Sequence, residues 1–179
     1  MASAVICCIT ACASWADLNS GLVLRFSFDE NQSGLVTDQS GTYHNDGFVN
    51  GAVYTTDGIS GGAYTFDGIN DEIIVSNAAC LNPANEITIS AWMKCAGTGT
   101  YNGIVMLKGA PPRGNTAQYG LIYFPNNSQG VQGKASFCTG VGWWSDHYSA
   151  WNLDTDTWYH LVGTYKSGSL NLYVNGTLA

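Results

Sequence analysis

Regular alternation of apolar and polar residues is the feature that most constrains the fold of this chain. Every second residue of 22–28 is apolar, and the same period recurs in 86–94 and 170–174. Successive side chains of a strand point to opposite faces of its sheet, so this period predicts half-buried β-strands. Further strands are predicted at 63–66, 72–76, 103–108, 119–124, 134–138 and 157–165. The predicted inward face includes Phe26, Phe66, Ile89, Ala91, Leu161 and Leu172, whereas Trp92 falls on the opposite face.

Turn signals separate these strands, and no stretch has helical spacing with caps. Dipeptides such as Asp46-Gly47, Asp67-Gly68 and Asn175-Gly176 favour tight turns. Short strands at this spacing predict a single all-β domain of the sandwich or barrel type.

Charge excludes some partners. The net charge is −7, and such a chain repels phosphate, so neither nucleic acid nor an anionic lipid surface is an expected partner. Nine of the thirteen carboxylates lie in residues 17–72, where Arg25 is the only Lys or Arg. Acid this concentrated either stays solvated or collects a cation.

The first sixteen residues have the composition of a targeting segment. Residues 1–16 are apolar, rich in small side chains and end in two small-x-small cleavage sequences, which predicts a signal peptide and a secreted domain at 17–179. The segment is too short for a transmembrane helix, so no membrane insertion is expected. The run Ile9–Cys12 also resembles a bacterial lipobox, which would make Cys12 a lipid attachment site.

Six segments in order resemble the laminin G-like jelly roll of the concanavalin A-like lectin/glucanase superfamily. They are 24–29, 38–47, 64–71, 87–94, 158–165 and 172–176. The resemblance covers residues 21–179 and implies a two-sheet antiparallel β-sandwich. Family members usually continue past the Asn175-Gly176 turn with another strand or more, so the chain is interpreted as a fragment that lacks its C-terminal strand or strands.

The resemblance also implies a calcium ion among the glycine-rich turns, because the family often carries one there. The candidate ligands are oxygen-bearing side chains of the kind that Ca²⁺ prefers. They are Asp38, Asn45, Asp46, Asp67 and Asp71. The alternative is that these residues only form turns, as Asp and Asn often do.

An aromatic tract near the C-terminal end predicts a ligand site. Flat rings stack on the apolar faces of sugars, and neighbouring polar groups can hydrogen-bond sugar hydroxyls. The candidate residues are Trp143, Trp144, Asp146, His147, Tyr148 and Trp151. The alternative is that some of these rings pack beneath the loop that carries them.

Three cysteines remain outside the targeting segment, and one disulfide is predicted among them. Cys95 and Cys138 fall at the ends of predicted strands, whereas Cys80 lies in an irregular segment. The predicted pair is therefore Cys95–Cys138.

The sequence lacks the patterns of the catalytic jelly rolls. It has no Glu-x-Asp-x-x-Glu strand, no Gly-x-Ser-x-Gly elbow and no histidines at metal-ligand spacing. The expected function is a non-catalytic extracellular module that binds carbohydrate or a cell-surface protein. The alternatives are a glycosidase or polysaccharide lyase domain and a structural adhesion spacer.

Overall fold

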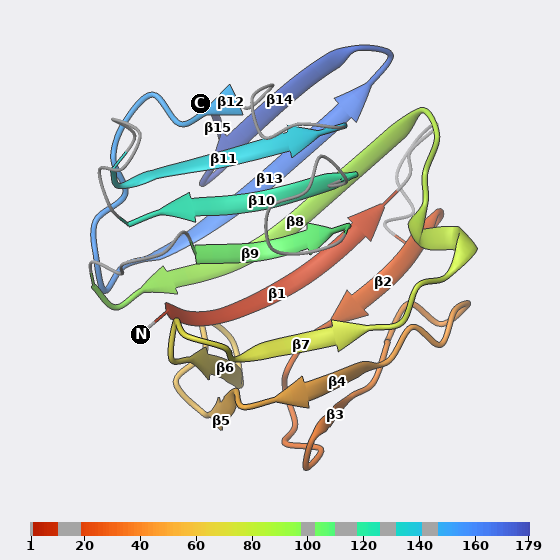
Figure 1. The fold of residues 1–179 in the computed structure, drawn as a ribbon, viewed down its shortest axis with the longest axis vertical. Coiled ribbons are helices and arrows are strands. Elements are labelled where there is room, and N and C mark those ends of the chain that lie inside the picture. Colours follow the sequence, from red (N-terminus) through yellow and green to blue (C-terminus); the bar gives the residue numbers. More distant parts are fainter. Residues whose placement is uncertain (1, 11–18, 98–102, 110–117, 126–131, 141–146) are drawn as a thin grey trace.

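Antiparallel strands make up nearly all the regular structure of the chain (Figure 1). The computed structural model describes residues 2–10, 19–97, 103–109, 118–125, 132–140 and 147–179, with 2–10 and 147–148 described as backbone. The one helical element in these residues is a 3₁₀ turn at Ala79–Leu81. No helix in the described part of the chain is long and apolar enough to cross a membrane. The predicted all-β fold is therefore confirmed.

The large sheet has eight strands. Its order is β15 (Thr177–Leu178), β14 (Ser169–Val174), β13 (Trp158–Lys166), β8 (Glu86–Cys95), β1 (Ala2–Thr10), β6 (Ala63–Phe66) and β5 (Val53–Thr55), with β2 (Leu22–Phe26) also paired to β1. The β14–β15 hairpin turns at Asn175 and Gly176, where both residues have positive φ angles. The Asn-Gly turn predicted from the sequence is confirmed.

Two smaller sheets form the opposing layer. A four-stranded sheet has the order β12 (His147–Tyr148), β11 (Lys134–Thr139), β10 (Tyr119–Phe124) and β9 (Gly103–Lys108). A three-stranded sheet has the order β3 (Leu35–Val36), β4 (Gly47–Asn50) and β7 (Glu72–Val75). In Figure 1 the four-stranded sheet lies in front of β8, β13 and β14, so the two layers form the predicted sandwich.

Strand β1 occupies the middle of the large sheet. It pairs along one side with β8 and along the other with β6 and then β2, and both long pairings contain a register shift. Residues 2–10 belong to the segment interpreted as a signal peptide. In the structure this segment lies between β2 and β8 in the large sheet. Its removal as a signal peptide stays a prediction.

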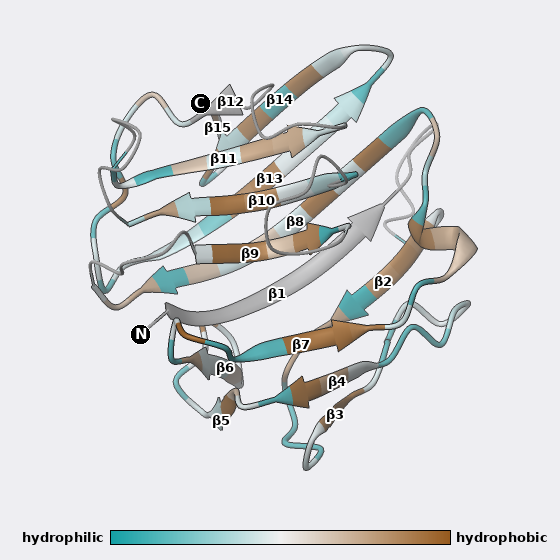
Figure 2. Cartoon of the chain, viewed as in Figure 1, coloured by the Kyte–Doolittle hydropathy of each residue, from teal (hydrophilic) through white to brown (hydrophobic). Residues whose placement is uncertain are grey.

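The core lies between the two layers. Ile89, Ala91 and Leu161 of the large sheet are completely buried, as are Leu121 and Phe137 of the facing four-stranded sheet. The predicted inward residues Phe26 and Leu172 are also buried, whereas Phe66 is only partly buried against the core. Hydrophobic and hydrophilic residues alternate along β14 (Figure 2), as expected for a strand with one buried face.

Candidate functional site

The outer face of the large sheet, defined here as the face of β8, β13 and β14 away from the core, gathers polar and aromatic side chains in rows. Burial alternates along β8, so its even-numbered residues point outward. Strand register then places outward residues of β13 and β14 directly beside them. The rows are Glu86–Lys166–Ser169, Thr88–Thr164–Asn171, Ser90–Val162–Tyr173, Trp92–His160 and Lys94–Trp158.

Trp92 and His160 stack on each other at one end of this face. Their ring centroids lie 5.0 Å apart with an interplanar angle of 22°. Ser90 Oγ lies 2.7 Å from His160 Nε2, and the backbone N–H of His160 donates to Asn175 Oδ1 at 2.9 Å. Burial lowers the pKa of His160 below its usual range, which favours the neutral ring.

The Ser90–His160 pair is the nearest approach to a catalytic arrangement on this face. A nucleophile with an adjacent base also needs a group that orients the base and donors that stabilise an oxyanion. Among the described residues, the stacking partner of the His160 ring is Trp92 and its hydrogen-bond partner is Ser90, and neither is a carboxylate. The pair therefore fits a structural hydrogen bond better than a nucleophile–base dyad.

Lys94 connects the aromatic end of the face to the loop after β5. Its ammonium lies 2.9 Å from Asp57 Oδ2 and 5.2 Å from the ring centroid of Trp158. Cation–π contact and ion pair together hold the lysine over the ring.

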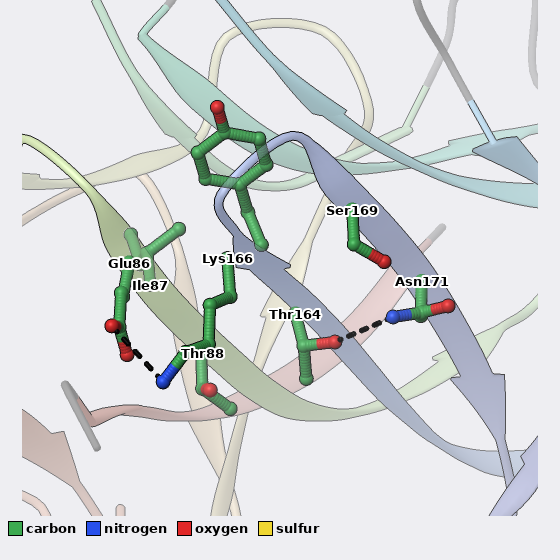
Figure 3. A pocket seen from close by; sticks show the side chains of 8 residues that line it. Glu86, Ile87, Thr88, Thr164, Lys166, Ser169 and Asn171 are labelled. Atoms are coloured by element: carbon green, nitrogen blue, oxygen red, sulfur yellow. Dashed lines mark hydrogen bonds and ion pairs between the residues drawn. The ribbon is translucent and has the colours of Figure 1, made fainter. Parts of the chain in front are cut away.

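A shallow pocket of about 380 Å³ occupies the other end of the same face (Figure 3). Thr88, Thr164 and Asn171 form its polar row, in which Asn171 Nδ2 donates to Thr164 Oγ1 at 3.5 Å. The Lys166–Glu86 ion pair, at 3.1 Å, borders it. Ile87 and Tyr165, which pack with the core, also line the pocket, so it combines apolar side chains with hydroxyl and amide groups that donate and accept hydrogen bonds.

The described part of the predicted aromatic site lies at the edge of the four-stranded sheet. Trp143, Trp144 and Asp146 fall outside the described residues, while the backbone of His147 and Tyr148 forms the edge strand β12. Trp151 lies three residues after Tyr148 and is 40% exposed.

Buried Ser149 anchors the chain between β12 and Trp151. Its hydroxyl accepts from the backbone N–H of Ala135 at 3.1 Å and donates to the backbone oxygen of Trp151 at 2.8 Å. The backbone N–H of Ser149 also donates to the oxygen of Ala135. The backbone at Trp151 is therefore held against β11 while its side chain stays accessible.

Buried Asp38 holds the segment between β3 and β4 in place through four hydrogen bonds to its carboxylate. Its Oδ1 accepts from the backbone N–H groups of Arg25 and Ser40, at 3.0 and 2.9 Å. Its Oδ2 accepts from Ser40 Oγ and the backbone N–H of Asn45, at 2.9 and 3.0 Å. Four bonds use about all the lone pairs of a carboxylate, so Asp38 fits poorly as a metal ligand.

Asn45 and Asp46 complete the same cluster. The amide of Asn45 donates to the backbone oxygen of Val23 at 2.7 Å, and Asp46 Oδ1 accepts from the backbone N–H of Asp38 at 2.8 Å. These bonds fasten the segment to β2. In the sequence, the Asp38-Gln39-Ser40 spacing is the signal for such a local side-chain turn.

Asp67 and Asp71 form a second cluster between β6 and β7. Asp67 Oδ1 accepts from the backbone N–H groups of Ile69 and Asn70, at 2.8 and 3.3 Å, and Asp71 Oδ2 accepts from the backbone N–H of Asp67 at 2.8 Å. The bond from Ile69 is the main cause that lowers the pKa of Asp67.

The five candidate calcium ligands do not form one site. Among the described residues, no three acidic, histidine or cysteine side chains converge as a metal centre would require. One oxygen of each of Asp46, Asp67 and Asp71 accepts no described hydrogen bond, and only the second cluster has two such carboxylates. A calcium site there stays a prediction.

The predicted Cys95–Cys138 disulfide is not formed. Both residues are thiols, as is Cys80. Cys95 faces the core between the layers, whereas Cys138 packs with Ile122 and Phe124 on the far side of the four-stranded sheet. The two thiols thus point into different spaces, although both strands were predicted correctly.

Sequence reasoning placed Trp92 on the outer face but missed its stacking on His160. The sequence did carry one signal for this contact, since the alternation of buried and exposed positions places both residues on outward positions of predicted strands. The register that brings them side by side could not be deduced without the fold.

Comparison with known proteins gives one match. The model of a family described as the concanavalin A-like lectin/glucanases superfamily matches residues 66–179, well over half of the chain. No curated protein and no solved structure matches.

Proposed function

The chain belongs to the concanavalin A-like lectin/glucanases superfamily, and on that premise we propose that it is a non-catalytic extracellular module that recognises carbohydrate. The fold alone does not decide this, because function resides in the site. The observation that supports the proposal is the exposed Trp151 ring on a backbone fixed by Ser149 at the edge strand β12. A fixed, accessible aromatic ring suits stacking on a sugar with little loss of conformational entropy.

The proposed ligand site is the surface around β12. It comprises Trp143, Trp144, Asp146, His147, Tyr148 and Trp151. The rings would stack on sugar faces, and Asp146 and His147 would hydrogen-bond hydroxyls. A cell-surface protein is the alternative ligand, because Trp and Tyr are also the residues that anchor protein interfaces.

A non-catalytic role is proposed from the carboxylates. Asp71 and Glu72 adjoin in sequence, so they do not project together as the acid pair of a glycosidase must. Asp154 and Asp156 precede β13 with no third carboxylate near them in the sequence. A glycosidase or lyase would release products from the glycans it binds, which separates the enzyme alternative from the proposal.

The test is a glycan array probed with the full chain and with Trp151→Ala. The expected result is glycan binding that Trp151→Ala weakens at least tenfold. Phe48→Ala is the matched control, because Phe48 is a 58% exposed aromatic on β4 of a different sheet. Binding to no glycan, together with binding to a cell-surface protein, would replace carbohydrate with a protein ligand. Binding to neither would leave the adhesion-spacer alternative.

A further inference from the structure

An apolar row crosses the outer face of the three-stranded sheet, and hydrophobic residues lie on all three of its strands (Figure 2). Strand register places Leu35 of β3 beside Phe48 of β4, and Phe48 beside Ile74 of β7. Phe48 is 58% exposed and Ile74 is 47% exposed, whereas Leu35 is partly buried. A contiguous exposed apolar surface marks a contact site or favours aggregation unless something covers it.

A tight turn joins one end of this row to the segment that follows β2. Gln32 and Leu35 form an antiparallel bridge, and the two residues between them, Ser33 and Gly34, have positive φ angles of 53° and 98°. Two positive φ angles are typical of a type I′ hairpin turn. Gln32 therefore lies one strand spacing from Leu35 and three spacings, about 14 Å, from Ile74.

Asn31 begins an N-glycosylation sequon at this end of the row. The sequence Asn31-Gln32-Ser33 has the Asn-x-Ser pattern without proline, and both Asn31 and Ser33 are exposed. Asn31 Oδ1 accepts from the backbone N–H of Ser33 at 3.1 Å, which makes an Asx-turn. The amide nitrogen of Asn31 has no hydrogen-bond partner among the described residues. The atom that would carry a glycan is therefore unengaged.

The sequon at Asn175-Gly176-Thr177 suits this modification less well. Asn175 Oδ1 accepts from the backbone N–H of His160 at 2.9 Å, and the backbone N–H of Asn175 donates to the oxygen of His160. These bonds hold the Asn175 turn against β13, so a glycan there would crowd paired strands. The side-chain bonds of Asn31 and Gln32 lie within residues 31–37, so their loop takes its shape locally. The third sequon, at Asn126, lies outside the described residues.

We propose that Asn31 is an N-glycosylation site and that its glycan covers the apolar row of Leu35, Phe48 and Ile74. In the transfer, Asn31 Nδ2 forms a bond to the anomeric carbon of an oligosaccharide carried on a lipid diphosphate. The bond from that carbon to the diphosphate oxygen breaks, the lipid diphosphate leaves, and Nδ2 gives one proton to the transferring enzyme. The attached glycan is bulky and hydrated, so it keeps other chains away from Phe48 and Ile74. The proposal rests on the extracellular role proposed above, because this transfer acts on chains that enter the secretory route.

The test is secretion of the full chain from an animal cell line, followed by peptide mass spectrometry after enzymatic removal of N-glycans, which converts a glycosylated asparagine to aspartate. Conversion is expected at Asn31 and not at Asn175. Asn31→Gln and Ser33→Ala should each abolish it, because they break the sequon at different residues. Asn175→Gln is the matched control and should leave the Asn31 glycan in place.

The location of the chain separates this proposal from the extracellular role. A chain in the medium that carries no glycan at Asn31 overturns the glycosylation site and leaves the extracellular role standing. A chain that stays in the cytosol without a glycan overturns both.

Sedimentation velocity tests the covering role. The glycosylated chain should stay monomeric, whereas Asn31→Gln should self-associate at a roughly tenfold lower concentration, as expected when apolar side chains become available for burial. The unaltered chain after enzymatic deglycosylation should behave in the same way, which excludes a folding defect of the variant. Adding Phe48→Thr to Asn31→Gln should restore the monomer, because threonine keeps strand propensity without the apolar ring. Equal self-association with and without the glycan overturns the covering role.

Discussion

A single added methyl group at Gly163 tests the packing of the two layers. Gly163 lies in β13, opposite Ile89 and Leu172, and its inner side contacts the ring of Phe137. A Cβ at this position would lie 2.8 Å from Phe137 Cδ1 and still closer to two other ring atoms. Real Cβ atoms do not approach so closely, so the ring or the strand must move. Phe137 is completely buried and has little room to move.

The expected cost of Gly163→Ala follows from this overlap. Overpacking a well-packed core costs about 1–3 kcal/mol, and contact with a fully buried ring places this case near the upper end. Replacing glycine by alanine in a strand returns about 0.5–1 kcal/mol. The free energy of unfolding should therefore fall by about 2 kcal/mol. For a domain of this size that lowers Tm by roughly 4–8 °C.

Gly103→Ala is the matched control. A Cβ at Gly103 of β9 would meet its nearest atom at 3.7 Å, an ordinary contact, so its stability should be unchanged or rise by up to about 1 kcal/mol. Urea unfolding measures both variants. Phe137→Leu should relieve the steric overlap that Gly163→Ala creates with the Phe137 ring. A double-mutant cycle would then show a favourable coupling energy of about 1 kcal/mol or more between the two substitutions. A Gly163→Ala chain as stable as the unaltered chain would refute the packing described here.

Four further predictions concern the N-terminal strand, two turns and one histidine. A chain without residues 1–16 should melt below the full chain, because it loses the strand between β2 and β8; equal melting temperatures would show that β1 adds nothing. Asp38→Ala should cost roughly 3 kcal/mol in urea unfolding, because four donors lose a buried charged acceptor; a loss below about 1 kcal/mol contradicts this role. Burial lowers the pKa of His160, so the neutral ring contributes to folding stability above the unfolded pKa of 6.5, and this contribution is lost as the pH falls through the lower folded pKa; an NMR titration that gives His160 a pKa at or above 6.5 would contradict this prediction. Millimolar Ca²⁺ should raise Tm and EDTA lower it, with no difference in Asp67→Ala; the absence of any shift in calorimetry removes the metal prediction.

The strands were predictable because alternation reports a half-buried face directly. Predicted strands at 63–66, 103–108 and 119–124 coincide with β6, β9 and β10. The short strands β3, β4, β5, β12 and β15 were missed, since their two to four residues display little or no period. Strand β1 was missed for another reason. An apolar run is expected both for a strand in the middle of a covered sheet and for the hydrophobic part of a leader.

The site was less predictable than the fold, because it depends on what each polar atom bonds to. Asp38 has the residue type and turn context of a calcium ligand, but backbone N–H groups already use its oxygens. The predicted Cys95–Cys138 disulfide was wrong because the side chain of Cys138 lies on the face of β11 that points away from Cys95. Residues 135–138 are buried throughout, so the sequence gives no sign of which side of β11 faces the large sheet.

The position of β1 fixes an order of events during synthesis. Its partners in β8 lie about 80 to 90 residues further along the chain, so at ~5–20 residues per second the first strand waits roughly 4–18 s for its neighbour to be made. Pairings this distant in sequence also make folding slow once the chain is complete. β2 and β6 are made earlier and can pair with one edge of β1, but until β8 arrives the other edge of this apolar strand stays unpaired and available to a chaperone or an export receptor.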